Sequence, residues 1–412
     1  MNLTIDQGRL LSEIEALAQI SDAEPPAVTR VVFTPTDLKA RTWLRKKCLE
    51  QDLAVRQDAV GNMFARWAGT DETSAPVATG SHIDAIPNAG KYDGVVGVLG
   101  GLEAIRALQH SGFRPMRSIE LILFTSEEPT RFGIGCLGSR MLSGALTVEA
   151  ARKLTDASGE TLEHVRRKAD MQGDLESVQL ESGHFHAFVE LHIEQGPLLE
   201  RAHVPLGIVE SIAAPASYQL IAEGAGGHAG GVLMPDRKDA LCAAAEIILT
   251  IEQAALACGS TDTVATVGIC DVFPAAVNSI PSRVRLTLDL RDTDLARRDQ
   301  VFRAIENKSR AVSEKRSVSL QFQIVNADAP AICSSTVTDA LVRSCSKHNL
   351  RFQKIVSRAY HDSLFMSRIA PTGMLFIPCR NGYSHRPDEF ASPEDIARGT
   401  LILAETLAEL SH

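Results

Sequence analysis

The chain has 412 residues, of which 44% are hydrophobic and 23% are charged, and its formal net charge is −9. This length and composition predict a globular protein with two domains and exclude a largely disordered chain. The acidic balance argues against nucleic acid or an anionic membrane as a partner, because both bind basic surfaces.

Targeting signals and cysteine usage indicate the compartment. No apolar run approaches the roughly 18 residues that a membrane-spanning helix needs, and the first 20 residues lack the pattern of a signal peptide. The eight cysteines are scattered without a CxxC pair, which is typical of reduced, mostly buried thiols. We therefore expect a cytoplasmic protein.

The first third of the chain alternates helical and strand patterns. Apolar residues at helical spacing predict packing helices over 9–20, 36–52 and 95–112, and residues 53–69 predict two strands about a turn at Gly61-Asn62. Short apolar strands are expected just before His82 and over 118–125. Strands separated by helices indicate an open, mostly parallel α/β sheet with function at the carboxyl ends of its strands. The charged stretch 144–181 is expected to be surface.

The stretch GSHIDAIPNAGKYDG (80–94) offers one imidazole and two nearby carboxylates in a Gly-rich, bend-prone run. In extended backbone, side chains two apart share a face, so Asp84 is expected to hold the His82 ring. A turn after Pro87 would bring Asp93 back toward His82, and a carboxylate can bridge two cations. We interpret this stretch as half of a two-metal site; the plainer alternative is a polar loop with a capping Asp.

Glu127 and Glu128 follow directly after a nearly continuous apolar strand. Consecutive side chains point to different sides, so one can bind a cation while the other faces the attacking water as general base. We assign Glu128 to the metal and Glu127 to the base. A solvated acidic turn is the alternative, and it fits poorly after a buried strand.

Two later strands end in similar groups. The stretch AFVELHIEQGP (187–197) places His192 and Gln195 near the end of a strand, and His385 follows the strand predicted at 374–379. His192 and His385 complete a predicted ligand set with His82, Asp93 and Glu128. The sequence after His385 predicts a helix that begins at Ser392-Pro393 with an N-cap.

Residues 213–329 have a different predicted order of elements, β-α-β-β-α-β, which is the ferredoxin-like split βαβ pattern. We expect a small α+β domain inserted into the catalytic domain formed by 1–212 and 330–412. In 284–291 the apolar residues take every even place, so Arg291 ends on the open face at the rim. Arg291 there suits bidentate capture of a carboxylate, with a surface salt bridge as the alternative. His228, in a Gly-rich turn, is either a hydrogen-bond donor to an oxyanion or only part of a polar turn. The same two alternatives hold for Asn278.

These motifs resemble those of the M20 peptidase superfamily, in particular its hydantoinase/carbamoylase branch. The similar stretches span almost the whole chain: GSHIDAIPNAGKYDG, FTSEEPTRFG, ELHIEQGP, GAGGHAG, VNSIPS with the later Arg291, and GYSHRPDE. The resemblance implies a dinuclear metal-dependent amidohydrolase, with manganese the first expectation and zinc, cobalt or nickel the alternatives. It also implies a homodimer joined through the inserted dimerisation or lid domain.

Residue by residue, the resemblance implies that Asp93 is shared between two ions. His82 and His192 would hold one ion, Glu128 and His385 the other, and Glu127 would be the base. Four positions match substrate-binding positions of the family, and the last three would reach the active site of the partner subunit: Gln195, His228, Asn278 and Arg291. In catalysis His228 would also stabilise the oxyanion.

Longer strings, among them FTSEEPTRFGIGCLGSR and FIPCRNGYSHRP, are similar to members of this branch that act in ureide degradation. The implied reaction is hydrolysis of the ureido amide of a small ureido-carboxylate, ureidoglycolate, to ammonia, carbon dioxide and glyoxylate. The alternative substrates are allantoate and N-carbamoyl-L-amino acids, and substrate choice is expected near Tyr360-His361-Asp362 and Tyr383. A catalytically silent binding or scaffold protein is a further alternative.

Overall fold

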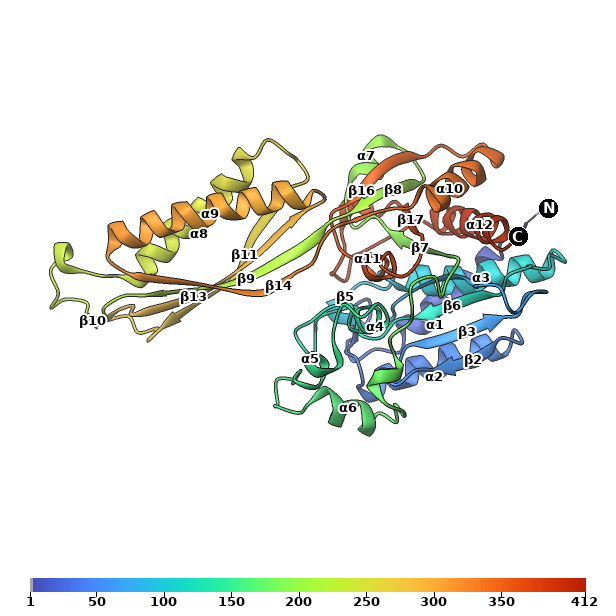
Figure 1. Cartoon of the computed structure of the whole chain (residues 1–412), viewed down its shortest axis with the longest axis horizontal. Coiled ribbons are helices and arrows are strands. Elements are labelled where there is room, and N and C mark those ends of the chain that lie inside the picture. The colour runs from blue at the N-terminus through green and yellow to red at the C-terminus, as the bar shows by residue number, and fades with distance from the viewer. Residues whose placement is uncertain (1–2) are drawn as a thin grey trace. The chain divides into compact units, whose positions relative to one another are not determined.

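The computed structural model describes residues 3–412, which form two compact units (Figure 1). The first unit runs to Glu210 and takes in Ile332–Ile355 and His361–His412. The second unit comprises Ser211–Ala331 and Val356–Tyr360, and the latter short segment lies outside the range 213–329 expected from the sequence.

A nine-stranded sheet forms the centre of the first unit. Its strands follow the order β15 (Ala331–Ile332), β8 (Gly207–Ile212), β17 (Thr372–Ile377), β7 (Ala187–Ile193), β4 (Val77–Ser81), β6 (Ile119–Leu123), β3 (Met63–Trp67) and β2 (Ala54–Gln57), with β16 (Gln353–Ser357) paired to β8. The neighbours β17, β7, β4 and β6 run parallel. β8 is antiparallel to β17, and β3 and β2 continue the other side in antiparallel fashion. The predicted open α/β sheet is therefore confirmed, with its parallel strands at the centre.

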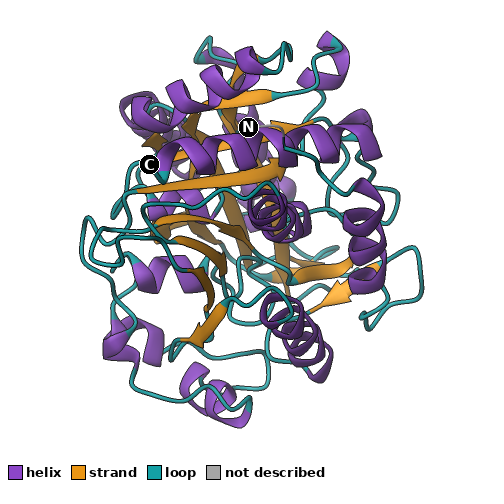
Figure 2. Cartoon of the chain, turned by 90° about the vertical axis from the view of Figure 1, so that its right-hand side faces the viewer, coloured by secondary structure: helices purple, strands orange, loops and turns teal. Residues whose placement is uncertain are grey.

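Helices surround the strands of this sheet (Figure 2). Those of the first unit are α1 (Gln7–Ala18), α2 (Pro35–Leu49), α3 (Val95–His110), α4 (Leu137–Leu142), α5 (Val148–Arg152), α6 (Leu162–Lys168), α7 (Leu198–Ala202), α10 (Ser335–Lys347), α11 (Asp362–Met366) and α12 (Pro393–Leu410), with 3-10 turns η1 (Leu175–Ser177) and η3 (Arg380–Gly382). A two-stranded ribbon pairs β1 (Val28–Arg30) with β5 (Ala85–Ala89).

Successive residues of β6 enter two different hydrophobic cores, because side chains alternate across a strand. Leu121 packs in a core with residues of α1, α2, α3, α10 and α12, whereas Ile122 packs in a core with residues of α4, α5 and α6. The expectation that 144–181 is surface was therefore wrong in part. Leu162 and Val165 of that stretch are buried in the second core, because the free face of the sheet needs a cover.

The second unit has a four-stranded antiparallel sheet of order β11 (Val264–Phe273), β13 (Arg283–Asp292), β9 (Ala214–Glu223) and β14 (Ser319–Ala327). Helices α8 (Ala240–Ala257) and α9 (Leu295–Arg316) pack on it, and a short ribbon pairs β10 (Gly227–His228) with β12 (Ser279–Ile280), near the 3-10 turn η2 (Met234–Asp236). The order of elements is the predicted β-α-β-β-α-β. As the alternation in β13 indicated, Val284, Leu286, Leu288 and Leu290 are buried while Arg285 faces away.

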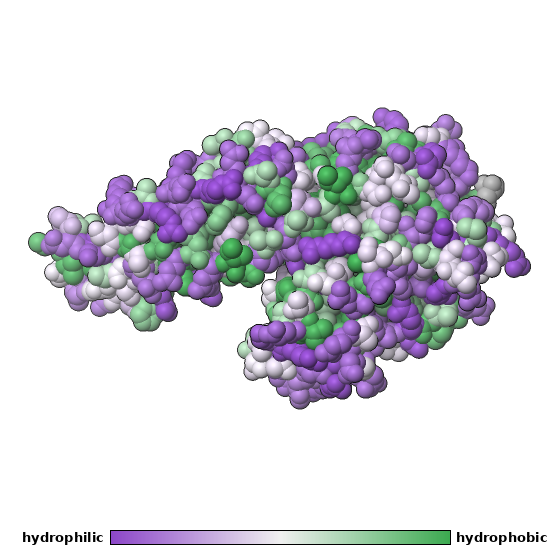
Figure 3. All heavy atoms as spheres, in the orientation of Figure 1, coloured by the Kyte–Doolittle hydropathy of each residue, from purple (hydrophilic) through white to green (hydrophobic). Residues whose placement is uncertain are grey.

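One expectation about membranes needs correction. Among residues 3–412, α8 is long and apolar enough to cross a membrane, with a mean hydropathy of 1.6 over 18 residues. The alanines and the two glutamates of this helix interrupt its strongly apolar residues, so the sequence shows no unbroken apolar run there. Its inner side, which includes Ile247 and Ile251, packs in the core of the second unit. Hydrophilic residues cover much of the face seen in Figure 3, with hydrophobic patches among them.

Arg30 ties α1 to the loop that carries His82. Its buried guanidinium donates to the carbonyls of Leu17 and Ile20 at the end of α1 and to that of Ile83, at 2.6–3.0 Å. Burial lowers the pKa of Arg30 to about 10, so the group stays charged at neutral pH.

We predict that Arg30→Ala lowers the free energy of unfolding by about 3 kcal/mol or more, because three buried carbonyls lose their donor at about 1–3 kcal/mol each. Urea denaturation measures the change. The control is Lys39→Ala at an exposed position of α2, where we expect a change within about 0.5 kcal/mol. Equal unfolding midpoints for the two variants would contradict this account.

Candidate metal centre

Four parallel strands deliver the candidate site residues to one edge of the sheet. His82 follows β4, Glu127 and Glu128 follow β6, His192 lies near the end of β7, and His385 lies beyond β17. Since these strands run parallel, their carboxyl ends lie at the same edge. Asp93 joins them there from the turn just before α3.

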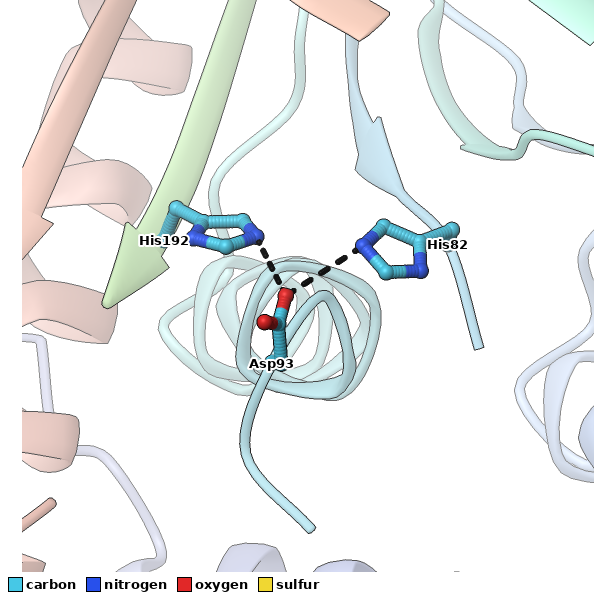
Figure 4. Close-up of side chains that lie close together, drawn as sticks. All are labelled: His82, Asp93 and His192. Carbon is cyan, nitrogen blue, oxygen red and sulfur yellow. Dashed lines mark ion pairs between the residues drawn. The ribbon is translucent and has the colours of Figure 1, made fainter. Parts of the chain in front are cut away.

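Asp93 turns one carboxylate oxygen toward each of two donor groups. Its Oδ1 lies 3.4 Å from His82 Nε2 and 3.3 Å from His192 Nε2. Figure 4 shows both rings facing this carboxylate. Its Oδ2 lies 3.3 Å from His385 Nε2, which is also 3.1 Å from Glu128 Oε1. Within each group the possible ligand atoms lie within 4.8 Å of one another, which suits a cation in each. The five side chains predicted to converge are thus brought together.

The histidine rings are held so that Nε2 faces the carboxylate. His82 Nδ1 is 3.0 Å from the carbonyl oxygen of Asp84, and His192 Nδ1 is 2.9 Å from that of Ile193. A neutral ring that donates from Nδ1 presents the lone pair of Nε2, as a metal ligand must. For His192 this nitrogen also accepts the N–H of Gly94 at 3.1 Å. Nε2 of both rings faces Asp93 Oδ1, and a cation between these atoms would be stabilised by all three, so the donor set fits a metal ion.

The electrostatics of the site also attract positive charge. Burial lowers the pKa of His82, but the carboxylates of Glu127, Asp93 and Asp84 outweigh it and raise that pKa well above its ordinary value. Burial raises the pKa of Asp93, yet the facing imidazoles of His192, His385 and His82 hold it well below its usual range. The carboxylates therefore stabilise any cation, proton or metal, placed among the rings.

Glu127 lies beside this cluster without joining either donor group. Its Oε2 is 3.8 Å from His82 Nε2, and its Oε1 accepts the thiol of Cys136 at 3.3 Å. Burial, followed by the charges of Glu128, Asp362 and Asp93, raises the pKa of Glu127 well above its ordinary value although His82 opposes this. A buried carboxyl with a raised pKa at a cluster of ligands suits a group that takes up and returns a proton.

Asp84 acts differently from the sequence expectation. The His82 ring is held by the backbone carbonyl of Asp84, whereas its carboxylate oxygen is 3.7 Å from the same nitrogen. The two carboxylate oxygens accept the N–H groups of Glu127 at 3.2 Å and Glu128 at 3.0 Å. The reason is geometric, because the loop after β6 has buried N–H groups that need an acceptor. Asp84 therefore joins the loop of His82 to the two glutamates.

Gln195 lies against the shared carboxylate. Its backbone has a positive φ of 54°, and its Nε2 donates to Asp93 Oδ2 at 2.7 Å. The amide thus lies at the metal-ligand cluster, where the family resemblance implied a substrate contact.

The other three predicted substrate-binding residues lie in the second unit. His228 in β10 pairs with Ser279 of β12, and the N–H of Ala229 donates to the carbonyl of Asn278, so His228 and Asn278 are neighbours. Arg291 lies one residue before the end of β13, forms an ion pair with Asp289 at 2.7 Å, and lies over the ring of Tyr360 at 5.8 Å. The Asp289 contact is the salt bridge that the sequence left as the alternative.

His361 and Asp362, near which substrate choice was expected, also lie beside the site. The His361 ring packs at a tilt of 58° against the ring of His192, with the ring centroids 4.4 Å apart, and Asp362 accepts the hydroxyl of Ser139 at 2.5 Å. Burial and the charge of Glu190 raise the pKa of Asp362 to about 8. Glu190, His192 and His361 form a third buried group of possible ligands. The sequence analysis named Tyr360-His361-Asp362 only as a place of substrate choice and did not predict that His361 and Asp362 pack against the metal-ligand cluster.

Comparison with known proteins identifies the class. The family model "Peptidase family M20/M25/M40" matches residues 78–409. The chain is 51% identical to "Ureidoglycolate hydrolase" of Arabidopsis thaliana, with 100% of this chain and 88% of that protein covered. It is 37% identical to "N-carbamoyl-L-amino-acid amidohydrolase" of a Pseudomonas species, with 98% of each covered. The chain therefore belongs to the M20/M25/M40 peptidase family, whose members are hydrolases.

A solved structure agrees over the whole chain. The crystal structure of AtUAH in complex with (S)-hydroxyglycine matches with a TM-score of 0.92 and 50% identity over 99% of this chain and 98% of that one. A second structure of AtUAH, in complex with glyoxylate, matches with a TM-score of 0.91 over the same shares of the two chains. Aminopeptidase PepT of Bacillus cereus, at 16% identity and a TM-score of 0.67, shares the fold alone.

We predict that Asp84→Ala lowers metal affinity about 10- to 100-fold, the usual effect of removing a group that holds ligands in place. Two buried N–H groups also lose their acceptor, at about 1–3 kcal/mol each. Isothermal titration of metal-free protein and urea denaturation measure the two effects. Asp71→Ala, which removes an aspartate that accepts bonds within an exposed turn, is the matched control. Unchanged affinity in Asp84→Ala would refute the positioning role.

Proposed function

We propose that the chain hydrolyses the ureido amide of ureidoglycolate, with two divalent metal ions per subunit and manganese as the metal. The main support for this substrate is sequence identity. About half of the residues, over the full length of this chain, are identical to those of proteins named ureidoglycolate hydrolase from Arabidopsis thaliana and Oryza sativa. The ligands glyoxylate and (S)-hydroxyglycine in the structures of AtUAH support the same substrate class. Eight free thiols fit the cytoplasm as the compartment.

The proposed ligand roles follow the two donor groups. His82 and His192 would hold one ion, Glu128 and His385 would hold the other, and Asp93, which belongs to both groups, would be shared. When bound, the ions would polarise the carbamoyl group and make water a better nucleophile at neutral pH. The rings need their Nδ1 contacts to keep Nε2 aimed at the ions.

Glu127 performs the proton transfers in this proposal. It takes a proton from the water that attacks the carbamoyl carbon, and it returns a proton to the nitrogen that leaves when the C–N bond breaks. The products are the carbamate, which divides into ammonia and carbon dioxide, and hydroxyglycine, which loses ammonia to give glyoxylate. The raised pKa of Glu127 helps its protonated form to act as the acid in the second transfer.

The second unit completes the site in a homodimer. We propose that residues 213–329 join two subunits, and that His228, Asn278 and Arg291 bind substrate in the partner's site, with His228 donating to the oxyanion. Exposed apolar side chains on this unit, including Phe273 and Ile324, support an interface there. Gln195 contributes from the same chain as the metal ligands.

We predict the fastest ammonia release from ureidoglycolate, slower release from allantoate and from an N-carbamoyl-L-amino acid, and no release from any of them after chelation. Addition of manganese to the metal-free protein should restore the activity. Faster turnover of allantoate or of the N-carbamoyl-L-amino acid would show that this compound is the substrate instead. Turnover that survives complete metal removal would exclude the metal assignments. No turnover of any ureido compound would favour a binding or scaffold protein.

We predict that two inactive variants complement each other. Glu127→Gln should lower kcat about 10²- to 10⁴-fold because the proton transfers are lost. His228→Ala should lower kcat about 10²- to 10³-fold because an oxyanion donor is lost. A mixed dimer has one complete site if each site takes His228 from the partner, so remixed subunits should regain about a quarter of wild-type activity. Mixtures no more active than the separate variants would place His228 outside the partner's site.

A further inference from the structure

Glu389 reaches from the C-terminal loop to the turn that carries Asp93. Its Oε1 accepts the backbone N–H of Tyr92 at 2.8 Å and that of Asp93 at 3.1 Å, across almost 300 residues of sequence. The side chain is buried, with only 5% of the residue exposed. A single carboxylate oxygen therefore fixes the backbone from which the shared carboxylate projects.

Ser384 links the other oxygen of Glu389 to the carboxylate itself. The Ser384 hydroxyl lies 2.5 Å from Asp93 Oδ2 and 3.0 Å from Glu389 Oε2. Glu389 thus holds the backbone of Asp93 directly and lies beside the Ser384 hydroxyl that contacts the Asp93 side chain. Since Asp93 must turn one oxygen toward each donor group, a small rotation of its carboxylate would disturb both groups together.

His385 depends on the same loop. It is the most exposed of the five converging residues, at 44% of its side chain, and its backbone has a positive φ of 59°. Only three residues separate it from Glu389, whose own N–H donates to the carbonyl of Arg386 at 3.1 Å. The anchored Glu389 closes this loop and keeps the His385 ring near Asp93.

Gly90 packs so closely against the Glu389 side chain that this position has no room for a Cβ atom. A Cβ added at Gly90 would lie 2.3 Å from Glu389 Cβ and 2.5 Å from its carboxyl carbon, which is closer than real Cβ contacts allow. Only glycine at this position leaves room for the carboxylate. Gly90→Ala therefore displaces Glu389 without removing it.

We propose that Glu389 is a positioning residue that sets the Asp93 carboxylate and the His385 loop in the geometry that both metal sites need. It acts through Tyr92, Asp93 and Ser384 and is not itself a ligand. The inference rests on the proposed two-metal site. It assigns a function to Glu389 at the end of the GYSHRPDE stretch, in which only Tyr383 and His385 were given roles from the sequence.

The test is metal affinity, measured by isothermal titration of metal-free protein with manganese alone. We expect Glu389→Ala and Gly90→Ala to lower the affinity about 10- to 100-fold. Glu389→Gln should stay close to wild type, because its amide oxygen accepts both N–H groups and its NH₂ donates to Ser384. Asp388→Asn is the matched control, since Asp388 pairs with Arg386 on the exposed side of the same loop.

Thermal unfolding of the metal-free and metal-loaded forms separates positioning from simple support. A merely structural Glu389 would lower Tm of the metal-free protein in Glu389→Ala and leave the manganese affinity at the wild-type value, and that result overturns the inference. Loss of affinity in Glu389→Gln equal to that in Glu389→Ala would also overturn it. A wild-type protein that binds no manganese would overturn the proposed function, and this inference with it. If Glu389→Ala fails to fold, Gly90→Ala and Glu389→Gln decide the question.

Discussion

The structure depends on the placement of one carboxylate. Asp93 lies at the start of α3 with His82 and His192 facing one of its oxygens and His385 facing the other. Buried ionised groups are costly unless opposite charge or hydrogen bonds compensate. Here the compensation comes from three rings, from Gln195 and from Ser384, which belong to distant parts of the chain. The fold of the first unit brings these distant parts of the chain together around Asp93.

The parallel centre of the sheet explains why that convergence is possible. β17, β7, β4 and β6 lie side by side and end at one edge, so residues far apart in sequence arrive within a few ångströms. Hydrogen bonds between the loops then fix the details. Arg30 holds the loop of His82 to α1, and Asp84 holds the glutamates of the next loop. The rigid scaffold supplies the position, and these polar contacts supply the orientation that catalysis requires.

Much of this could be predicted from residue patterns. The alternation in 284–291 indicated which face of β13 is buried, and the apolar run before Glu127 indicated a central strand. The convergence of His82, Asp93, Glu128, His192 and His385 also followed from strand ends and from the family resemblance. The rest depended on tertiary contacts that leave no local pattern. The real partners of the Asp84 carboxylate are N–H groups more than 40 residues away, and Glu389 meets Asp93 only in the folded chain. That α8 is a core helix follows only from its packing against the sheet of the second unit.

The most direct test of the account is anomalous diffraction from crystals grown with manganese. The account predicts two peaks per chain, about 3.5–4 Å apart on either side of the Asp93 carboxylate, as in other two-metal sites. In Asp93→Ala both peaks should weaken together because the shared ligand is gone. A single peak, peaks away from Asp93, or full occupancy of both sites in Asp93→Ala would contradict the central claim that one carboxylate joins two metal ions.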